Sequence, residues 1–427
     1  MRIAIIGGGA SGMITAYLLD RQGHKVTVFE SQPVLGGHIR TLNKNIQHHT
    51  NSSALLEAGV LEFPIEFKNF LQLMQALEVP LEPVELGSGI FFQNGNHFLS
   101  PVMIEHNFHG LKKWLELLHI DGLYAQSLGL WLKTHLAQLK NLRGKSLSTY
   151  LSDESIPITW IKLLTMYSYS MPYESIDNFP ADLAIPALRR YVFSNWFRIK
   201  GGVYSYIEKI VMRFSGEIFL NAAITEVYRS DNAVQIQGHI SGSHTFNRHF
   251  DQVIFATPPD QVLQMLADAR PEEIRRFQAW KPNHITTVLH RDSSLYAPHK
   301  IQQGSEFDFF QSGSDWGYNA SLNQLCGISS SEICSLAFNL QDQIDPEKII
   351  HIQQHHTPFY DVESFRHRDE IVAKNGEHNT YHVGAYLGDG LHEGAVTSAM
   401  NVAQMIGPTH AEEALSLLQD RSVLVLN

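Results

Sequence analysis

The sequence predicts an α/β fold in which a parallel sheet forms around a strand–turn–helix–strand unit at the N-terminus. Residues 2–6 are a short, continuous apolar run, as in a strand that is buried on both faces. A glycine-rich turn over 7–12 follows, and apolar residues then recur at helical spacing up to Gly23. A second apolar run over 26–29 ends in an acidic residue. This order of elements is typical of a βαβ unit.

The glycine turn has the spacing of a dinucleotide-binding loop. Gly7 permits the tight turn, Gly9 lets the backbone approach a pyrophosphate, and Gly12 lets the helix pack closely on the strand. The start of the helix offers free N–H groups and a partial positive charge to phosphates. The sequence therefore predicts a Rossmann-type domain, with cofactor contacts from Gly7, Gly9, Ala10, Ser11 and Gly12.

Glu30 stands at the end of the second predicted strand. A carboxylate in this position accepts hydrogen bonds from the ribose hydroxyls of a dinucleotide and repels a 2′-phosphate, which disfavours NADP. A second glycine pair follows at once in the segment Leu-Gly-Gly-His-Ile-Arg-Thr, residues 35–41. It would let the backbone lie against a longer cofactor. The contacts expected in this segment are Gly36, Gly37, His38, Arg40 and Thr41.

With this doublet the sequence resembles the glycine-doublet flavoproteins, which include amine oxidases, phytoene desaturases and protoporphyrinogen oxidases. The resemblance implies FAD as the cofactor, bound in a discontinuous domain with an inserted α+β substrate domain. Neither Cys326 nor Cys334 lies in a recognised flavin-attachment motif. We therefore expect non-covalent FAD.

Two later segments also resemble this superfamily. Strands are predicted over 217–220, 223–228, 233–237 and 252–255, and the last runs into an Ala-x-Pro-Pro pattern. The resemblance implies that the backbone of Val227 touches the adenine and that Ala256 lies near the cofactor. Residues 381–396 resemble the closing motif, in which a helix begins at the flavin ring. Tyr386 departs from it, because amine oxidases commonly have an acidic residue there. The contacts implied by this motif are Gly388, Asp389, Glu393, Gly394 and Ala395.

A closer resemblance concerns the segments 196–202, 288–295 and 384–393. They are similar to a subgroup of predicted FAD-binding proteins related to those found with cyclopropane-fatty-acyl-phospholipid synthases. This likeness implies a lipidic substrate. The expected FAD-binding domain comprises residues 1–63, 196–268 and 372–427, and the expected substrate or cap domain comprises 64–195 and 269–371.

The sequence also offers catalytic candidates and a surface for lipid. Aromatic side chains over the flavin would line an apolar pocket. Residues 111–142 are rich in leucine, tryptophan and lysine at helical spacing. This segment either packs on its own domain or lies on an anionic membrane surface. The candidates for a role at the reacting atoms are Lys200, His290, Trp316, Tyr318 and Asn319.

Composition excludes several other functions. The net charge of −11 disfavours nucleic acid as a partner, because phosphate binding needs a basic face. Two cysteines cannot build a disulfide framework, which favours a cytoplasmic location. No uninterrupted apolar window is long enough to cross a membrane, although peripheral attachment stays open. The 23 histidines show no metal-site spacing, so no metal is expected.

These observations predict an FAD-dependent oxidoreductase that transfers a hydride between an apolar organic substrate and flavin N5. Fatty-acyl lipids, amines and polyenes are the substrate classes considered. No second dinucleotide motif is present for NADH, so the electron acceptor is expected to be oxygen, a quinone or a protein. Two alternatives remain open: an FAD-dependent isomerase or mutase without net redox change, and a non-catalytic flavoprotein partner of a lipid-modifying enzyme.

Overall fold

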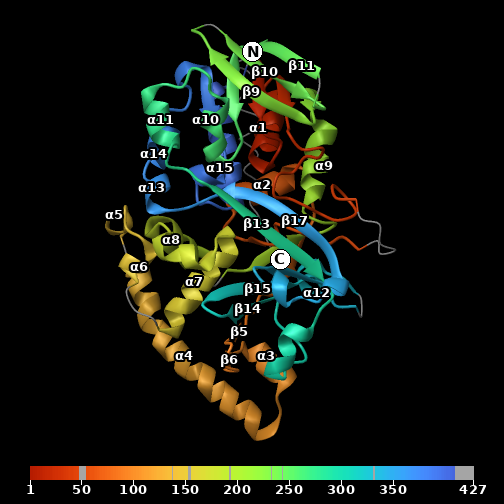
Figure 1. Cartoon of the computed structure of the whole chain (residues 1–427), viewed down its shortest axis with the longest axis vertical. Coiled ribbons are helices and arrows are strands. Elements are labelled where there is room, and N and C mark those ends of the chain that lie inside the picture. Colours follow the sequence, from red (N-terminus) through yellow and green to blue (C-terminus); the bar gives the residue numbers. More distant parts are fainter. Residues whose placement is uncertain are drawn as a thin grey trace. The chain divides into compact units, whose positions relative to one another are not determined.

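The structure is a computed structural model, in which contacts between residues divide the chain into two compact units (Figure 1). The first unit comprises Met1–Gly37, Tyr206–Gln278 and the chain from Arg368 onward, and the second comprises His38–Ser205 and Ala279–His367. The structure describes residues 1–47, 54–136, 138–151, 155–191, 194–231, 233–242, 244–329 and 332–408.

A five-stranded parallel sheet is the centre of the first unit. Its strand order is β18-β12-β1-β2-β8, and every neighbouring pair is parallel. The apolar run of β1 is buried, as the sequence predicts for a strand covered on both faces. The predicted α/β fold is therefore confirmed. The strands are β1 (Arg2–Ile6), β2 (Lys25–Phe29), β8 (Glu217–Phe219), β12 (Gln252–Phe255) and β18 (Thr380–His382).

A three-stranded antiparallel sheet of order β11-β10-β9 belongs to the same unit. The strands predicted over 217–220, 223–228, 233–237 and 252–255 are all present. β11 was not predicted from the sequence, because most of its residues are polar. Its bounds are His244–Phe250, and those of its partners are β9 (Ala222–Arg229) and β10 (Val234–Ile240).

Helices of the first unit pack on these sheets. α1 buries Met13, Ile14, Ala16 and Leu19, and it contacts α15. The helices are α1 (Ala10–Arg21), α9 (Tyr204–Arg213), α10 (Val262–Met265), α11 (Pro271–Phe277), α14 (Arg368–Ala373) and α15 (His392–Ile406).

A seven-stranded, mainly antiparallel sheet forms the second unit, in the order β17-β13-β16-β15-β14-β5-β6. A small sheet of order β3-β7-β4 accompanies it. The strands of the large sheet are β5 (Ile90–Phe91), β6 (His97–Phe98), β13 (Pro282–His290), β14 (Phe307–Ser312), β15 (Asp315–Ser321), β16 (Ser335–Phe338) and β17 (Ile349–Pro358). Those of the small sheet are β3 (Phe63–Pro64), β4 (Leu81–Val84) and β7 (Trp196–Ile199).

Most helices of the second unit come from its N-terminal segment. Among the described residues, no helix is both long enough and apolar enough to span a bilayer. The helices are α2 (Lys68–Ala76), α3 (Pro101–Asn107), α4 (Gly110–Leu136), α5 (Leu139–Leu142), α6 (Leu147–Tyr150), α7 (Ile156–Tyr169), α8 (Ala181–Tyr191), α12 (Leu322–Leu325) and α13 (Val362–Phe365).

Two segments expected in the FAD-binding domain, 38–63 and 196–205, group with the second unit. β7 lies between β3 and β4 in the small sheet. The carboxylate of Glu57 accepts hydrogen bonds from the Thr41 hydroxyl (2.8 Å) and the Val203 N–H (2.7 Å). These hydrogen bonds hold the two segments to each other, and the pairing of β7 with β4 joins them to the rest of the second unit. The assignment of the two units to cofactor and substrate stays a prediction.

Candidate functional site

The turn between β1 and α1 depends on its glycines. Gly7 has a φ of +110°, which a glycine adopts without strain. A Cβ atom on Gly12 would lie 2.0 Å from the carbonyl oxygen of Gly7, so only glycine allows this close packing. Ala10 and Ser11 open α1, whose N-cap residue Gly9 provides no side-chain cap, and the first turn has no acidic side chain. The start of α1 can therefore receive an anionic group.

Glu30 lies against this turn. Its Oε2 accepts a hydrogen bond from the Gly8 N–H (2.7 Å), and its Oε1 accepts one from the Gln32 N–H (2.8 Å). The residue is buried. Oε1 also accepts a hydrogen bond from the Ser31 hydroxyl (3.3 Å), whereas Oε2 can accept a second one from a ligand hydroxyl. The structure thus brings the predicted acid to the glycine turn.

The second glycine pair lies beside the first motif. The Gly36 N–H donates to the carbonyl of Gly8 (2.9 Å), and Gly36 forms a bridge with Gly9. Gly36 and Gly37 both have positive φ, at +115° and +59°. A Cβ on Gly37 would lie 3.0 Å from the Cα of Gly9. The two glycine segments thus meet backbone to backbone.

The three residues predicted after this doublet belong to the second unit. A ring nitrogen of His38, Nε2, lies 2.7 Å from the carbonyl oxygen of His356, and burial lowers the pKa of His38. The buried Arg40 donates to the carbonyl of Ile39 (3.2 Å). Thr41 is engaged with Glu57, as described above. Their expected contacts with the cofactor stay predictions.

Val227 and Ala256 occupy the sheets of the first unit. Val227 is fully buried in β9, and its carbonyl accepts a hydrogen bond from the Ala267 N–H (3.1 Å). Ala256 directly follows β12, and its N–H donates to the carbonyl of Ile6 (2.8 Å). The next hydroxyl, Oγ1 of Thr257, is buried and has no hydrogen-bond partner in the described part of the chain. A polar group of a ligand beside the glycine turn would satisfy it.

The closing motif forms a compact turn before α15. Oδ1 of Asp389 accepts hydrogen bonds from the N–H groups of Leu391 (3.0 Å) and Gly394 (2.8 Å). It therefore satisfies donors at the start of the helix. A Cβ on Gly388 would lie 2.5 Å from the Cα of Gly394, which explains the glycines. The first turn of α15 also holds the remaining predicted residues, Glu393 and Ala395.

The catalytic candidates do not meet at one point. Residues of a strand alternate between its two faces, so Trp316 and Tyr318 lie on one face of β15 and Asn319 on the other. Nε2 of His290 bonds to Oδ1 of Asn319 (2.8 Å), while Nδ1 accepts the N–H of Asp292 (3.1 Å). Burial lowers the pKa of His290. His290 of β13 and Asn319 of β15 therefore belong to a buried hydrogen-bond network between strands.

Lys200 lies in another environment. Its side chain is 66% exposed and pairs with Glu82 at 3.1 Å. Arg198 reaches the same carboxylate, at 3.1 Å. These hydrogen bonds lower the pKa of Glu82, so it remains charged near neutral pH. Lys200 thus belongs to a surface ion-pair cluster.

Comparison with known proteins decides the family. The model of the flavin containing amine oxidoreductases matches residues 10–290, which is well over half of the 427 residues. The chain belongs to this family. Membership in this flavin-containing family gives the chain a flavin cofactor, FAD.

Individual relatives of this flavoprotein are distant. It is 23% identical over 261 residues to 4,4'-diapolycopen-4-al dehydrogenase of Metabacillus indicus, a match that covers 53% of the chain and 50% of that protein. It spans about half the length of the curated relatives it matches.

Solved structures share the fold. Cyclohexylamine oxidase from Brevibacterium oxydans superimposes with a TM-score of 0.68 at 12% identity, over 95% of this chain and 99% of that one. A fatty acid isomerase from P. acnes gives 0.66 at 16% identity, over 94% and 98%.

The residues of the first unit fit FAD. The uncapped start of α1 suits a diphosphate, and Glu30 beside it suits the ribose hydroxyls. A Cβ on Gly37 would press on the Cα of Gly9 (3.0 Å), and the buried hydroxyl of Thr257 has no partner among the described residues. A turn that binds no cofactor would not require these four features in combination.

The second unit contains a carboxyl–hydroxyl pair that was not predicted from the sequence. Oε1 of Glu62 accepts a hydrogen bond from the hydroxyl of Tyr167 (2.7 Å). Its Oε2 is sealed from solvent and has no hydrogen-bond partner in the described part of the chain. Burial raises the pKa of Glu62 to about 7. The available signal was an acidic residue inside the otherwise apolar run 60–65.

Aromatic rings surround this pair. The ring of Tyr167 stacks on Phe307 at 4.5 Å and meets Tyr318 edge to face at 4.9 Å. Tyr167 thus contributes both its ring to the aromatic cluster and its hydroxyl to Glu62. Glu62 is thus a carboxyl group with one free acceptor atom beside an aromatic wall.

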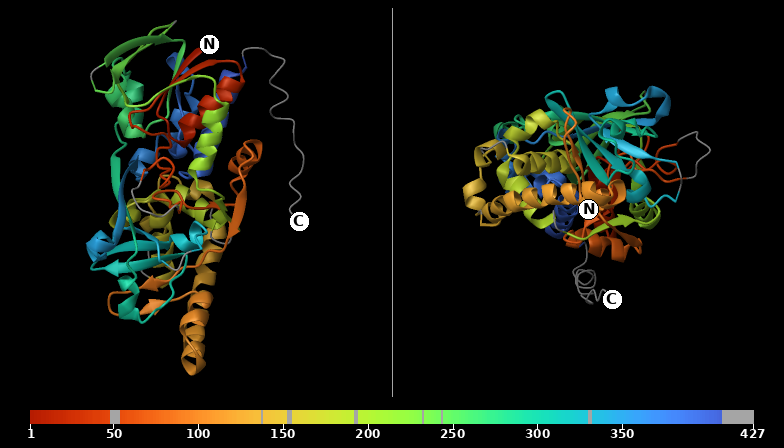
Figure 2. Two further views of the ribbon diagram at one scale, coloured as in Figure 1. Left: turned by 90° about the vertical axis from the view of Figure 1, so that its right-hand side faces the viewer. Right: turned by 90° about the horizontal axis from the view of Figure 1, so that it is seen from below.

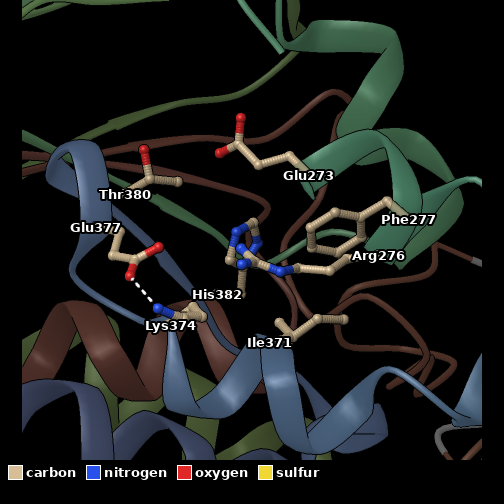
Figure 3. Close-up of a pocket in the computed structure, with 8 residues that line it drawn as sticks. All are labelled: Glu273, Arg276, Phe277, Ile371, Lys374, Glu377, Thr380 and His382. Atoms are coloured by element: carbon tan, nitrogen blue, oxygen red, sulfur yellow. Dashed lines mark hydrogen bonds and ion pairs between the residues drawn. The ribbon is translucent and has the colours of Figure 1, made fainter. Parts of the chain in front are cut away.

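A small pocket in the first unit is a different feature (Figure 3). His382 stands at its centre, between the rings of Phe255 (5.5 Å) and Phe277 (4.8 Å). Burial lowers the pKa of His382 to about 3, so it is neutral. The lysine and arginine of the pocket are already paired with Glu377 (2.7 Å) and Glu370 (3.1 Å). The pocket therefore lies beside β18, the strand at the start of the closing motif, and its lysine and arginine are already paired.

Proposed function

We propose that this flavoprotein removes a hydride from a carbon atom of an apolar organic substrate and transfers it to N5 of FAD. A fatty-acyl lipid, an amine or a polyene is the class of substrate that we consider. The observation that carries the proposal is the contact of Glu30 with Gly8 beside the uncapped start of α1. Bound FAD supplies the hydride acceptor, and the protein supplies binding, orientation and exclusion of water.

Each part of the cofactor has proposed partners in this chain. The N–H groups at the start of α1 bind the diphosphate, and Glu30 accepts hydrogen bonds from the ribose hydroxyls. The backbone of Val227 receives the adenine, and the start of α15 with Asp389 receives the flavin end. The remaining proposed contacts are those of the two glycine segments, of His38, Arg40 and Thr41, and of Ala256.

Oxidation of a carbon also releases a proton when the product gains a double bond. We assign this proton to Oε2 of Glu62, because that atom is sealed and unbonded while Tyr167 holds the other oxygen. A carboxyl group with a pKa near the working pH is suited to proton transfer. Bound FAD would take the hydride and Glu62 would take the proton, so that the two-electron step would balance.

The remaining proposals concern the surroundings of the reaction. FAD is bound without a covalent link, and the reduced cofactor passes its electrons to oxygen, a quinone or a protein. We place the protein in the cytoplasm. Residues 111–142 touch the membrane peripherally, because an apolar substrate would be dissolved in lipid.

The test begins with the visible spectrum of the purified protein. We expect the absorption spectrum of a flavin, and denaturation should release that flavin. At least one amine, polyene or fatty-acyl lipid should bleach the flavin spectrum under anaerobic conditions. A colourless protein that cannot be reconstituted with FAD would contradict the proposal. Conversion of a substrate without net bleaching or oxygen use would instead indicate an isomerase.

A matched pair of variants tests the proton acceptor. Glu62→Gln removes the titratable group but keeps the shape, so we expect the rate of anaerobic bleaching to fall at least tenfold and its pH dependence near pH 7 to disappear. Glu66→Gln, four residues later on the same segment, is the control, and its profile should follow the wild type. An unchanged profile in Glu62→Gln would remove Glu62 from the mechanism.

A further inference from the structure

α4 exposes a continuous apolar face. Figures 1 and 2 show it as one long helix at the margin of the second unit. Its largest side chains are open to solvent, among them Leu136 (79%), Leu111 (76%), Trp114 (66%) and Leu118 (66%). The outer face, as we call it below, consists of Leu111, Trp114, Leu115, Leu118, Leu132 and Leu136.

The opposite side of α4 is attached to the protein. Ile120 and Thr134 are buried, and Ile120 belongs to a core cluster with Phe108 and Ile104 of the α3 region. α4 also contacts α7 and α8. The helix is thus attached to the second unit through its inner side. Its outer face is exposed in this packed position, and not because the helix is loosely attached.

The spacing of the outer face is helical. Its leucines fall at 111, 115, 118, 132 and 136, and Gly122, Ala125 and Gly129 continue the same alternation of four and three residues. A Cβ on Gly122 or Gly129 would meet no atom within 4 Å. The stripe therefore runs along the whole helix, with large side chains towards both ends and small ones in the middle.

Cations border the outer face. Lys112 and Lys133 are exposed beside it, and Lys113 is partly exposed. α4 has two acidic residues: Glu116 lies 3.4 Å from His97 at the inner side, and Asp121 is exposed. The whole chain carries a net charge of −11, so the basic border is a local departure from its composition. Apolar side chains with a lysine border and a tryptophan are typical of a helix that lies in a membrane interface.

A second copy of the chain fits this face less well. Two antiparallel α4 helices centred near Gly122 and Ala125 would bring Lys112 of one copy towards Lys133 of the other, and like charges repel. The small residues in the middle would also bury little apolar area, whereas a soluble interface depends on such burial. In a bilayer the small residues merely lie at a shallower depth.

We infer that the outer face of α4 lies in the boundary between headgroups and acyl chains of an anionic bilayer, with Lys112 and Lys133 at the phosphates. This inference rests on the proposed function for its biological sense, since a lipid-dissolved substrate would be taken up there. Its physical basis, the exposed leucines and their lysine border, is independent of that function.

The first experiment measures binding of the full-length holoprotein to vesicles by flotation. We expect binding to vesicles of three parts phosphatidylcholine and one part phosphatidylglycerol, and at least tenfold weaker binding to phosphatidylcholine alone. Leu115→Glu/Leu118→Glu should lose at least tenfold in affinity for the anionic vesicles. Val211→Glu/Met212→Glu is the matched control, because it places two charges at exposed apolar positions of α9 and should bind like the wild type.

The second experiment locates the helix through tryptophan quenching by brominated lipid. Trp114 belongs to the outer face, whereas Trp131 packs on His135 at 4.0 Å and lies off that face. We therefore expect Trp114→Phe to abolish most of the quenching and Trp131→Phe to retain it. Equal loss in both variants, or no flotation of the wild type, would overturn the inference.

Light scattering without vesicles completes the test. A dimer that Leu115→Glu/Leu118→Glu converts to a monomer would show that a second copy covers the face, and the inference would be overturned. A monomer in both proteins supports it. The flavin spectrum and the bleaching by a soluble substrate are recorded on the same samples. Failure of the proposed function would therefore appear in the spectrum, and failure of membrane binding would appear only in flotation.

Discussion

A Cβ atom on Gly12 would lie 2.0 Å from the carbonyl oxygen of Gly7. Gly12→Ala therefore forces the start of α1 away from the end of β1, and overpacking of this kind costs about 1–3 kcal/mol. We expect the thermal midpoint of the apoprotein to fall and FAD to be lost. Differential scanning calorimetry of apoprotein and holoprotein checks this, and a midpoint equal to that of the wild type would contradict it.

Gly9 provides the matched control. Its φ of −75° suits any residue, and a Cβ there would lie 3.6 Å from the Cα of Gly37, an ordinary contact. Gly9→Val should therefore leave the apoprotein folded but block the approach of the diphosphate. We expect a normal far-ultraviolet circular dichroism spectrum with at least tenfold weaker FAD binding. A yellow, fully loaded variant would refute the assignment of the loop.

Glu30 tests the ribose end of the same site. Glu30→Gln keeps an acceptor for the Gly8 N–H but removes the charge. Hydrogen bonds to charged groups contribute about 1.5–3 kcal/mol, so we expect FAD to bind roughly 10–100-fold more weakly. Titration calorimetry with the apoprotein measures this. Glu217→Gln, on the neighbouring strand β8 and exposed, should bind FAD normally.

The glycine turn and Glu30 were predictable because their chemistry is local. Strand, turn, helix and acid lie within 30 residues, and each glycine has a steric reason that the spacing reveals. Glu62 and Tyr167 are far apart in sequence, and only the fold of the second unit joins them. The same limit explains why Trp316 and Asn319 were grouped, since a strand sends neighbouring side chains to opposite faces.

Arg229 should be the residue most important for stability beside the antiparallel sheet. Its side chain is 1% exposed and pairs with Asp268 (3.0 Å) and Glu273, so it links β9 to α11. Arg229→Met leaves Glu273 buried without its partner, which we expect to cost about 3–5 kcal/mol in the free energy of unfolding. Urea denaturation checks this. Arg248→Met breaks an exposed pair with Glu217 and should cost less than about 1 kcal/mol.

The pH dependence of the free energy of unfolding measures the contribution of Glu62. Its pKa in the folded protein is about 7, above the value of 4.5 for the free side chain, so the folded state binds more protons between these limits. The stability that protonated Glu62 contributes is fully present below pH 4.5 and is lost as the pH rises through 7. Since Glu62→Gln does not titrate, the wild type should lose stability relative to this variant over that window and run parallel to it above pH 8.

Tyr167→Phe provides the sign test for the same group. The Tyr167 hydroxyl donates to Glu62 and thereby stabilises the carboxylate, so its removal should raise the pKa of Glu62 further. The loss of stability should then extend to higher pH than in the wild type. The carboxyl infrared band of Glu62, identified by its absence in Glu62→Gln, should shift its midpoint in the same direction. A midpoint that stays near 4.5 in both proteins would mean that Glu62 is solvated, and it would then be no more suited to accept a proton than a surface acid.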